Sequence, residues 1–256
     1  MLYIVGTPIG NLEDISLRAL RILGSVSFVL CEDTRVTGKL LEHYKIKTPT
    51  MSYHQHSDLS KTNYILDLLG KGRDLALVSD AGTPGISDPG GKLVQAVIEK
   101  FGDDMKVESV PGPSAVTAAL SISGLPTDKF IFLGFPPHKK GRQTFLKKIM
   151  ESEFPVVVYE SKHRIVKFLE ELKGMSEKKD LDEKDGSEIT NYQLSITNKK
   201  EKQKTKKAVN LTSVVVAREL SKMHETVYRG KIDNIISKIK DSQDDQKGEF
   251  VVIIGK

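Results

Sequence analysis

The chain has 256 residues, 38% of them hydrophobic, which is enough to build the cores of one large domain or two ordinary ones, and we expect two. Its formal net charge of +5 is compatible with a polyanionic partner but is too small to establish nucleic-acid binding by itself. No window approaches the roughly 20 uninterrupted apolar residues that a membrane span needs, so the composition argues against a membrane protein.

The N-terminus and the cysteine content favour a cytoplasmic protein. The chain begins with a short strand-like run and lacks the basic segment and cleavage site of a signal peptide. Its single cysteine, Cys31, lies inside an apolar run and is interpreted as a small core residue, which suits a reducing compartment.

The first half of the chain alternates short apolar runs with segments of helical periodicity. This pattern is typical of βαβ units and a largely parallel sheet, and it places the chain in the α/β class. The expected strands are Leu2–Val5, Val26–Leu30, Leu75–Val78 and Val107–Val110. The expected helices are Ser16–Leu23, Thr34–His43, Lys61–Leu69 and Gly91–Phe101. Asp14 or Ser16 is suited to cap the first of these helices, and Asp88 the last.

A proline-rich segment separates the two halves of the chain. Pro111 and Pro113 fix φ and remove backbone donors on either side of Gly112, so this segment can continue neither a strand nor a helix. We therefore expect an N-terminal α/β domain over residues 1–112 and a C-terminal α/β domain over residues 113–256.

The same alternation resumes in the second half. The expected strands are Phe130–Gly134, Val156–Tyr159, Val214–Ala217 and Phe250–Ile254. The expected helices are Ser114–Ser121, Gly141–Met150, Arg164–Leu172 and Ile232–Ile239. A second α/β domain follows from this pattern.

A charged insertion interrupts the second half at about residues 174–210. Its composition changes to Lys, Glu, Asp, Ser and Thr, with too few apolar residues to offset the entropy of ordering, so a solvated insertion is the simpler interpretation. The alternative is an RNA-binding arm, because a run of lysines lies between Lys199 and Lys207.

Loops rich in glycine and proline follow the expected strands of the first domain. In open α/β sheets, ligands bind beyond the carboxyl ends of the strands, where glycine lets the backbone approach a ligand closely. Any single loop, taken alone, is better explained as a tight turn, but together they predict one pocket. The loops are Gly6–Asn11, Ser79–Gly85 and Pro111–Ala115.

These loops do not match the common nucleotide-binding motifs. No Gly-Lys-Ser or Gly-Lys-Thr closes Gly6–Asn11 as in a Walker loop, and none of the loops contains Gly-x-Gly-x-x-Gly. The ligand is therefore not expected to be ATP or NAD bound in the usual way. Asp80 could accept hydrogen bonds from a ligand hydroxyl or amine, or it could cap a turn.

Longer motifs, spread in order over nearly the whole chain, carry a specific resemblance. They are Leu2–Asp14, Glu32–Arg35, Ser79–Gly90, Val110–Ala115, Tyr159–Ser161 with His163 and Arg164, Ala217–Lys222 with His224 and Glu225, and Gly248–Val252. With these motifs the chain closely resembles the bacterial 16S ribosomal RNA cytidine 2′-O-methyltransferases, a family of the tetrapyrrole-methylase superfamily.

The resemblance implies a fold, a cofactor and a substrate. It implies two α/β domains of the tetrapyrrole-methylase type with the cofactor cleft between them, a homodimer and no metal. It also implies transfer of a methyl group from S-adenosylmethionine to a cytidine ribose in the decoding centre of 16S rRNA, with 16S rRNA or the small ribosomal subunit as partner. With Asp80 added, the implied cofactor-binding residues are Pro8, Ala81, Gly82, Thr83, Ile86, Ser114, Ala115, Tyr159, Glu160 and Arg218.

The chain departs from the family pattern in two places. One is the insertion at about residues 174–210, and the other is Lys162, where the family usually has proline. Both departures concern the docking of RNA rather than the expected cofactor loops.

Methyl transfer to a hydroxyl requires the attacking oxygen, the methyl carbon and the sulfur to be nearly collinear. The pKa of a carboxylic acid lies far below that of a ribose hydroxyl, so a carboxylate base must act as the new bond forms. Asp33 is the first catalytic candidate, because Glu32–Arg35 follows an expected strand and should lie at the same sheet edge as the glycine-rich loops. Asp33 is explained equally well as the cap of the helix that begins at Thr34. Glu225, with His224, is the candidate in the second domain.

Basic and aromatic residues near the motifs are candidates for RNA contacts. Arg35, His163, Arg164, Arg218 and Lys222 are assigned to the RNA backbone or to the flipped nucleotide. The alternative for these basic residues is surface ion pairing with Glu32, Glu160 or Glu219. The aromatic side chains suited to base stacking are Tyr53, Phe135 and Tyr159.

Two other functions compete with this one. A superfamily relative that methylates a tetrapyrrole precursor would share the fold, but the Gly-Thr-Pro-Ile-Gly-Asn and Glu-Asp-Thr-Arg forms of the motifs argue against it. A non-catalytic ribosome-binding factor is the other, and the intact cofactor loops weigh against it.

Overall fold

The computed structural model describes residues 1–255 except 55–56, 58, 89, 178–212 and 243, so most of the expected insertion, with its lysine run, lies outside the described residues. The chain divides into two compact units, Met1–Ala118 and Ala119–Lys256. The division falls within helix α5 (Ala115–Ser123), whereas the sequence places the boundary after Gly112, at the end of the preceding strand.

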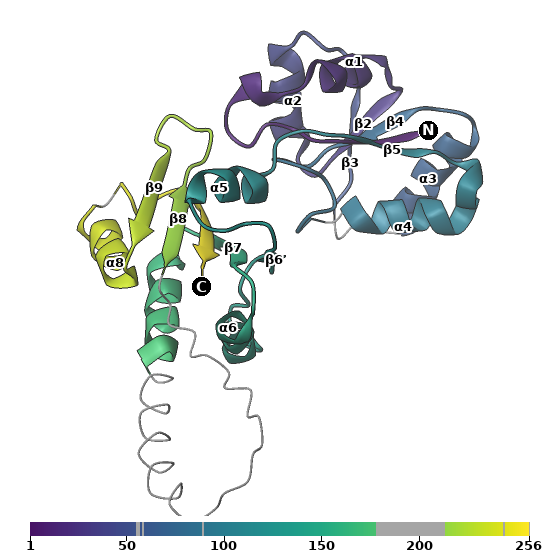
Figure 1. Ribbon diagram of the computed structural model, residues 1–256. Helices are drawn as coiled ribbons and strands as arrows, with labels where there is room; N and C mark the ends of the chain where they lie inside the picture. The colour runs from purple at the N-terminus through teal and green to yellow at the C-terminus, as the bar shows by residue number, and fades with distance from the viewer. Residues whose placement is uncertain (55–56, 58, 89, 178–212, 243, 256) are drawn as a thin grey trace, which may run out of the picture. The chain divides into compact units, whose positions relative to one another are not determined.

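The first unit is built on a parallel sheet of five strands in the order β3-β2-β4-β1-β5 (Figure 1). The strands are β1 (Leu2–Val5), β2 (Phe28–Cys31), β3 (Thr50–Ser52), β4 (Leu75–Leu77) and β5 (Val107–Val110). The expected parallel sheet is confirmed in this unit. Strand β3 is missing from the prediction, because its short sequence Thr-Met-Ser contains no apolar run.

Helices cover both faces of this sheet, α1 and α2 on one side and α3 and α4 on the other (Figure 1). They are α1 (Leu17–Ser25), α2 (Thr34–His43), α3 (Leu59–Gly70) and α4 (Gly90–Phe101), with short 3-10 turns η1 (Leu12–Asp14) and η2 (Gly102–Asp104). The Ser16 side chain caps α1 by accepting the Ala19 N–H, which decides between the two expected caps. Each helix pair closes its own apolar core on the sheet, so the strand ends are held on both faces.

The second unit contains a mixed sheet of five strands in the order β6-β7-β10-β8-β9. The strands are β6 (Ile131–Phe132), β7 (Val156–Ser161), β8 (Val214–Arg218), β9 (Thr226–Gly230) and β10 (Glu249–Ile254). Strands β6 and β7 are parallel, and the other neighbouring pairs are antiparallel. The expectation of a largely parallel sheet is therefore wrong for this unit, because β9 returns beside β8 as a hairpin and β10 runs between β7 and β8 in the opposite direction.

One apolar core supports this mixed sheet. Helix α6 (Arg142–Glu151), the helical residues 165–177 and α8 (Ile232–Asp241) pack on it. Phe168 and Phe250 are the largest side chains that this core buries completely or nearly so. No helix in the described part of the chain is long and apolar enough to cross a membrane.

The strand directions decide where the motif loops emerge. In the first sheet, the loops after β1, β2, β4 and β5 leave from one edge, because all of these strands are parallel. In the second sheet, β7 and β8 both run opposite to β10, and β6 runs with β7. The loops after β6, β7 and β8 therefore also share one edge.

Candidate active site

The loops that follow β1 and β4 are hydrogen-bonded to each other. Thr7 and Gly82 form an isolated antiparallel bridge, with N–H to carbonyl oxygen distances of 2.9 and 3.1 Å. The buried hydroxyl of Thr7 donates to the Ser79 carbonyl at 3.1 Å. Gly82 has φ +81°, a conformation that glycine adopts without steric cost. The expected proximity of these two loops is confirmed.

The loop after β5 joins the same edge through a close backbone crossing. A Cβ added at Gly6 would lie 2.8 Å from the Gly112 backbone, and one added at Gly112 would lie 2.7 Å from the Gly6 carbonyl oxygen. The Thr83 hydroxyl also donates to the Pro113 carbonyl at 3.4 Å. All of the glycine-rich loops named from the sequence therefore meet at one edge of the first sheet, as expected.

The loop after β2 brings carboxylates to this edge. The Asp33 N–H donates to the Asp80 carboxylate at 3.1 Å, so Asp80 joins the loop after β4 to the loop after β2. Glu32 is exposed, but partial desolvation by its neighbours raises the pKa of its carboxyl group, and the negative charges of Asp80 and Asp88 raise it further. Glu32 thus holds a proton more readily than an isolated glutamate.

The pKa of Asp33 is shifted in the opposite direction to that of Glu32. Asp33 is the N-cap of α2, accepting the Arg35 N–H at 2.8 Å, which confirms the capping alternative. Its carboxylate also accepts hydrogen bonds from the Arg35 guanidinium, the shortest at 2.6 Å. These bonds lower the pKa of Asp33 to about 2, which weakens it as a proton acceptor. Arg35 pairs with Asp33 rather than with Glu32.

In the second unit, Glu160 carries a buried carboxyl group at the end of β7. One carboxylate oxygen accepts the Ser161 N–H at 2.7 Å and pairs with Arg164 at 2.9 Å, so the expected alternative pairing of Arg164 is observed. The other oxygen, Oε2, is buried without a hydrogen-bond partner among the described residues. Burial raises the pKa of Glu160 in spite of the nearby guanidinium groups.

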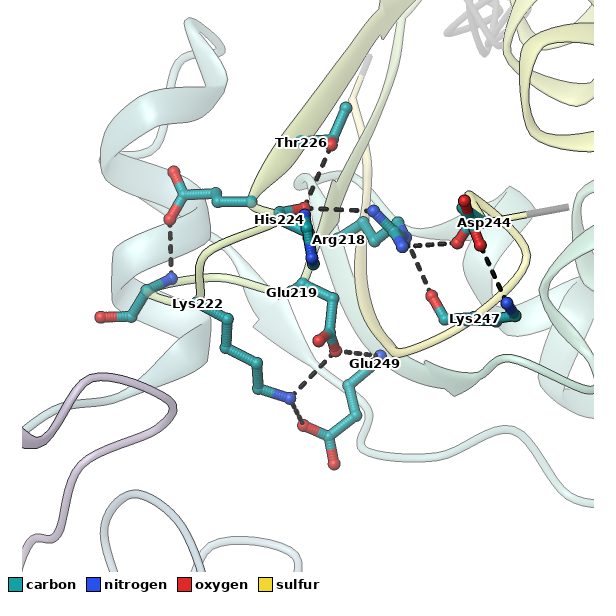
Figure 2. A network of polar contacts seen from close by, with 10 residues as sticks. Arg218, Glu219, Lys222, His224, Thr226, Asp244, Lys247 and Glu249 are labelled. Carbon is teal, nitrogen blue, oxygen red and sulfur yellow. Dashed lines mark hydrogen bonds and ion pairs between the residues drawn. The ribbon is translucent and has the colours of Figure 1, made fainter. Parts of the chain in front are cut away.

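Arg218 is turned into its own unit, where it joins two loops (Figure 2). Its guanidinium is buried and donates to the carbonyls of Lys247 at 2.8 Å, His224 at 3.1 Å and Asp244. An ion pair with Asp245 at 3.6 Å adds to these bonds. Arg218 therefore fastens the β8–β9 turn to the segment before β10.

The β8–β9 turn is strained and closely bonded. Glu219 and Ser221 have positive φ values of 51° and 67°, which non-glycine residues rarely adopt. Lys222 pairs with Glu219 and Glu249, each at 2.9 Å, so the expected alternative of surface pairing is observed for Lys222 (Figure 2). The carboxylate of Glu225 accepts the Ser221 N–H at 2.6 Å, which makes Glu225 part of the turn.

A family model described as Tetrapyrrole (Corrin/Porphyrin) Methylases matches residues 1–236. The chain belongs to this family. The tetrapyrrole methylases use S-adenosylmethionine as methyl donor, and this member is an S-adenosylmethionine-dependent methyltransferase.

Three of its relatives are named ribosomal RNA small subunit methyltransferase I. The protein from Hydrogenobaculum sp. is 42% identical over 100% of this chain and 95% of its own length. The Thermotoga maritima protein is 38% identical over 99% and 97%. The Escherichia coli O157:H7 protein is 38% identical over 99% and 77%.

Solved structures of other proteins share the fold. Diphthine synthase matches with a TM-score of 0.67 and 14% identity, covering 100% of this chain and 90% of that protein. Uroporphyrin-III-C-methyltransferase from Thermus thermophilus matches with a TM-score of 0.58 and 18% identity, covering 98% and 93%. At this level of identity the likeness concerns the fold alone.

The residues that the resemblance assigns to the methylase cofactor differ in accessibility. Pro8 and Gly82 are buried in the joined loops, whereas Asp80, Ala81 and Ile86 are exposed at their rim. The remaining residues of the first unit in this set are half-buried: Thr83, Ser114 and Ala115. In the described part of the chain, no cluster of three or more His, Cys, Asp or Glu side chains is arranged to hold a metal ion.

Two further features of the site edges are not singled out by the sequence patterns. Glu32 follows β2 directly, as Asp33 does, so position in the sequence does not distinguish the two carboxylates. The β6–α6 loop carries Lys139 and Lys140. Because β6 and β7 are parallel, this loop leaves the sheet at the same edge as the segment with His163.

Proposed function

We propose that this methyltransferase acts on the small-subunit ribosomal RNA and methylates a cytidine ribose at its 2′-oxygen in the decoding centre. The observation that carries the proposal is the joining of the glycine-rich loops at one edge of the first sheet, next to the carboxylates of Glu32 and Asp33. The names of the full-length relatives support ribosomal RNA as the substrate.

The proposed cofactor site follows the joined loops. We place S-adenosylmethionine against Pro8, the Asp80–Thr83 segment with Ile86, and Ser114 with Ala115, all of which belong to the first unit. The cofactor supplies a methyl group on a good leaving group, and the loops orient it. Arg218 would contribute indirectly, by fastening the β8–β9 turn, because carbonyl groups of its own unit already engage its guanidinium.

The proton of the ribose hydroxyl needs an acceptor as the new bond forms. Of the neighbouring carboxylates, Glu32 has the raised pKa and Asp33 the lowered one, so Glu32 replaces Asp33 as our first candidate. Glu225 is bound to its own turn, and we assign it to shaping that turn.

We further propose that the enzyme is a cytoplasmic homodimer and that Arg35 and His163 contact the RNA. The side chain of Arg35 is 87% exposed in spite of its pairing with Asp33, and His163 is exposed beside Arg164. Arg164 and Lys222 would act mainly through their ion pairs, which keep Glu160 and the β8–β9 turn in place.

One experiment tests the proposal against its rivals. Labelled S-adenosylmethionine is offered with small ribosomal subunits, with free 16S rRNA, or with a tetrapyrrole precursor, and any methylated ribose is mapped by primer extension. We expect label in a single cytidine ribose of the ribosomal substrate. Label in the tetrapyrrole alone, or tight binding of subunits without any transfer, would refute the proposal in favour of one of the other two functions.

A further inference from the structure

Two loops of the second unit carry basic side chains that have no acidic partner among the described residues. Lys139 and Lys140 belong to the β6–α6 loop, and Lys162 and His163 follow β7. All are exposed, and none forms an ion pair with a described residue, although Arg142, Arg164 and Lys222 at the same edge are each paired with glutamate. We call Lys139, Lys140, Lys162 and His163 the basic rim.

Hydrogen bonds fasten the two loops to each other. The Tyr159 N–H donates to the Gly134 carbonyl at 3.0 Å, which continues the parallel pairing of β6 and β7. The Arg164 side chain, after β7, donates to the Pro136 carbonyl at 3.1 Å, and the Arg142 side chain holds the β6–α6 loop itself by donating to the Pro137 carbonyl at 2.9 Å. The cations of the basic rim are therefore presented by a preorganised surface rather than by two independent loops.

The same two segments of the chain carry aromatic rings. Phe135 is 52% exposed, and its ring is tilted against that of Tyr159 at a centroid distance of 5.3 Å. The ring of Phe132 also contacts Tyr159, in an edge-to-face arrangement with a centroid distance of 4.8 Å. The Phe135 ring therefore packs against the Tyr159 ring while part of its surface stays exposed.

We propose that the basic rim and Phe135 form a docking surface for a single-stranded segment of the RNA substrate. Exposed aromatic faces stack nucleobases, and unpaired lysines bind the phosphates that connect them, which is the usual composition of single-strand binding surfaces. A duplex fits less well, because its bases are stacked on one another and not available to Phe135. This inference rests on the proposed function and specifies which surface of the second unit receives the RNA.

The test replaces the lysines in the full-length protein and measures binding of a fluorescein-labelled oligocytidylate over a range of salt concentrations. Each lost phosphate contact to a single strand lowers the slope of log affinity against log salt by about 0.7. We expect K139Q/K140Q/K162Q to lower this slope by about 2 and to raise KM for small ribosomal subunits, while the affinity for S-adenosylmethionine is unchanged. The control K238Q alters an exposed lysine of α8 that forms no ion pair with a described residue, and it should change neither the salt slope nor the KM.

A second pair of variants tests the stacking contact. F135A should weaken oligocytidylate binding about tenfold, and F135Y should retain it, because tyrosine keeps an aromatic face of the same size. An unchanged salt slope and unchanged affinity in both sets of variants would overturn the inference. If the wild type binds oligocytidylate through the rim but transfers no methyl group to small subunits, the proposed reaction fails while the docking surface stands.

Discussion

Two adjacent carboxylates at the end of β2 have opposite proton affinities. Arg35 holds Asp33 ionised, with a pKa of about 2, whereas partial desolvation and the charges of Asp80 and Asp88 raise the pKa of Glu32. A base that acts as a bond forms is more effective when its pKa is higher, provided that it is deprotonated at the working pH. The electrostatics of the two side chains therefore favour Glu32, which the sequence alone could not distinguish from Asp33.

This difference predicts the outcome of two isosteric substitutions. Glu32→Gln should lower kcat about 100-fold, and Asp33→Asn should lower it far less, because asparagine keeps the N-cap of α2. The rate constants are measured in single-turnover methylation of small ribosomal subunits, with the cofactor affinity determined separately. A larger loss in Asp33→Asn than in Glu32→Gln would return the base role to Asp33.

The buried carboxyl group of Glu160 predicts a pH-dependent stability. Its pKa is raised in the folded protein, so folding favours the protonated form, and this contribution is present below the unfolded pKa and is lost as the pH rises through the folded pKa. Glu160→Gln, which cannot ionise, should therefore gain stability relative to the wild type as the pH rises from about 4 to 7. Thermal unfolding midpoints of both proteins across this range check the sign. A difference that does not change with pH would show that Glu160 is ionised without penalty.

At the scale of the elements, the loops after β1 and β5 can approach each other closely because glycine, which has no side chain, stands at the crossing point. Gly6 and Gly112 cross so closely that a Cβ on either would lie within 2.8 Å of the other's backbone. Because backbone cannot move aside as a flexible side chain can, the two loops must separate if a methyl group is added. Their closeness therefore depends on glycine at both positions.

This crossing predicts a loss of both stability and cofactor affinity on substitution. Gly112→Ala should destabilise the protein by about 1 to 3 kcal/mol, as overpacking does, and weaken S-adenosylmethionine binding measured by calorimetry. Gly24→Ala is the matched control, because Gly24 lies in α1 with no atom within 4 Å of an added Cβ. The control should gain about 0.5 to 1 kcal/mol. Equal behaviour of the two variants would contradict this account of the loops.

The elements that the sequence missed share a physical cause. Strands β3 and β9 contain no run of apolar residues, so their extended conformation depends on pairing with β2 and β8. Local periodicity identifies a strand from the apolar side chains that it buries, and β3 buries none while β9 buries one. Helix α2 and strands β1 and β5, by contrast, have the bounds that their sequence pattern predicts.

At the scale of the whole molecule, there are two groups of lysines that are candidates for binding RNA, one in the charged insertion and one on the basic rim. The insertion's lysines, Lys199 to Lys207, lie outside the described residues, and their composition favours a solvated segment. Deleting residues 199–207 should therefore leave the salt slope of oligocytidylate binding unchanged, while the lysine substitutions on the rim lower it. A slope that falls by several units on deletion would instead identify the insertion as an RNA-binding arm.

The sequence by itself determined most helices and strands, the glycine-rich loops and the family, because each of these is recorded in neighbouring residues. Glycine and proline restrict the backbone locally, and apolar periodicity records which face of an element is buried. Only the tertiary structure decided the direction of β10 and the orientation of the Arg218 side chain towards the Lys247 carbonyl. It also decided that Arg35 pairs with Asp33, which lowers the pKa of Asp33 and not that of Glu32. These features depend on contacts between distant segments and on competition among nearby partners, which a local pattern of residues does not specify.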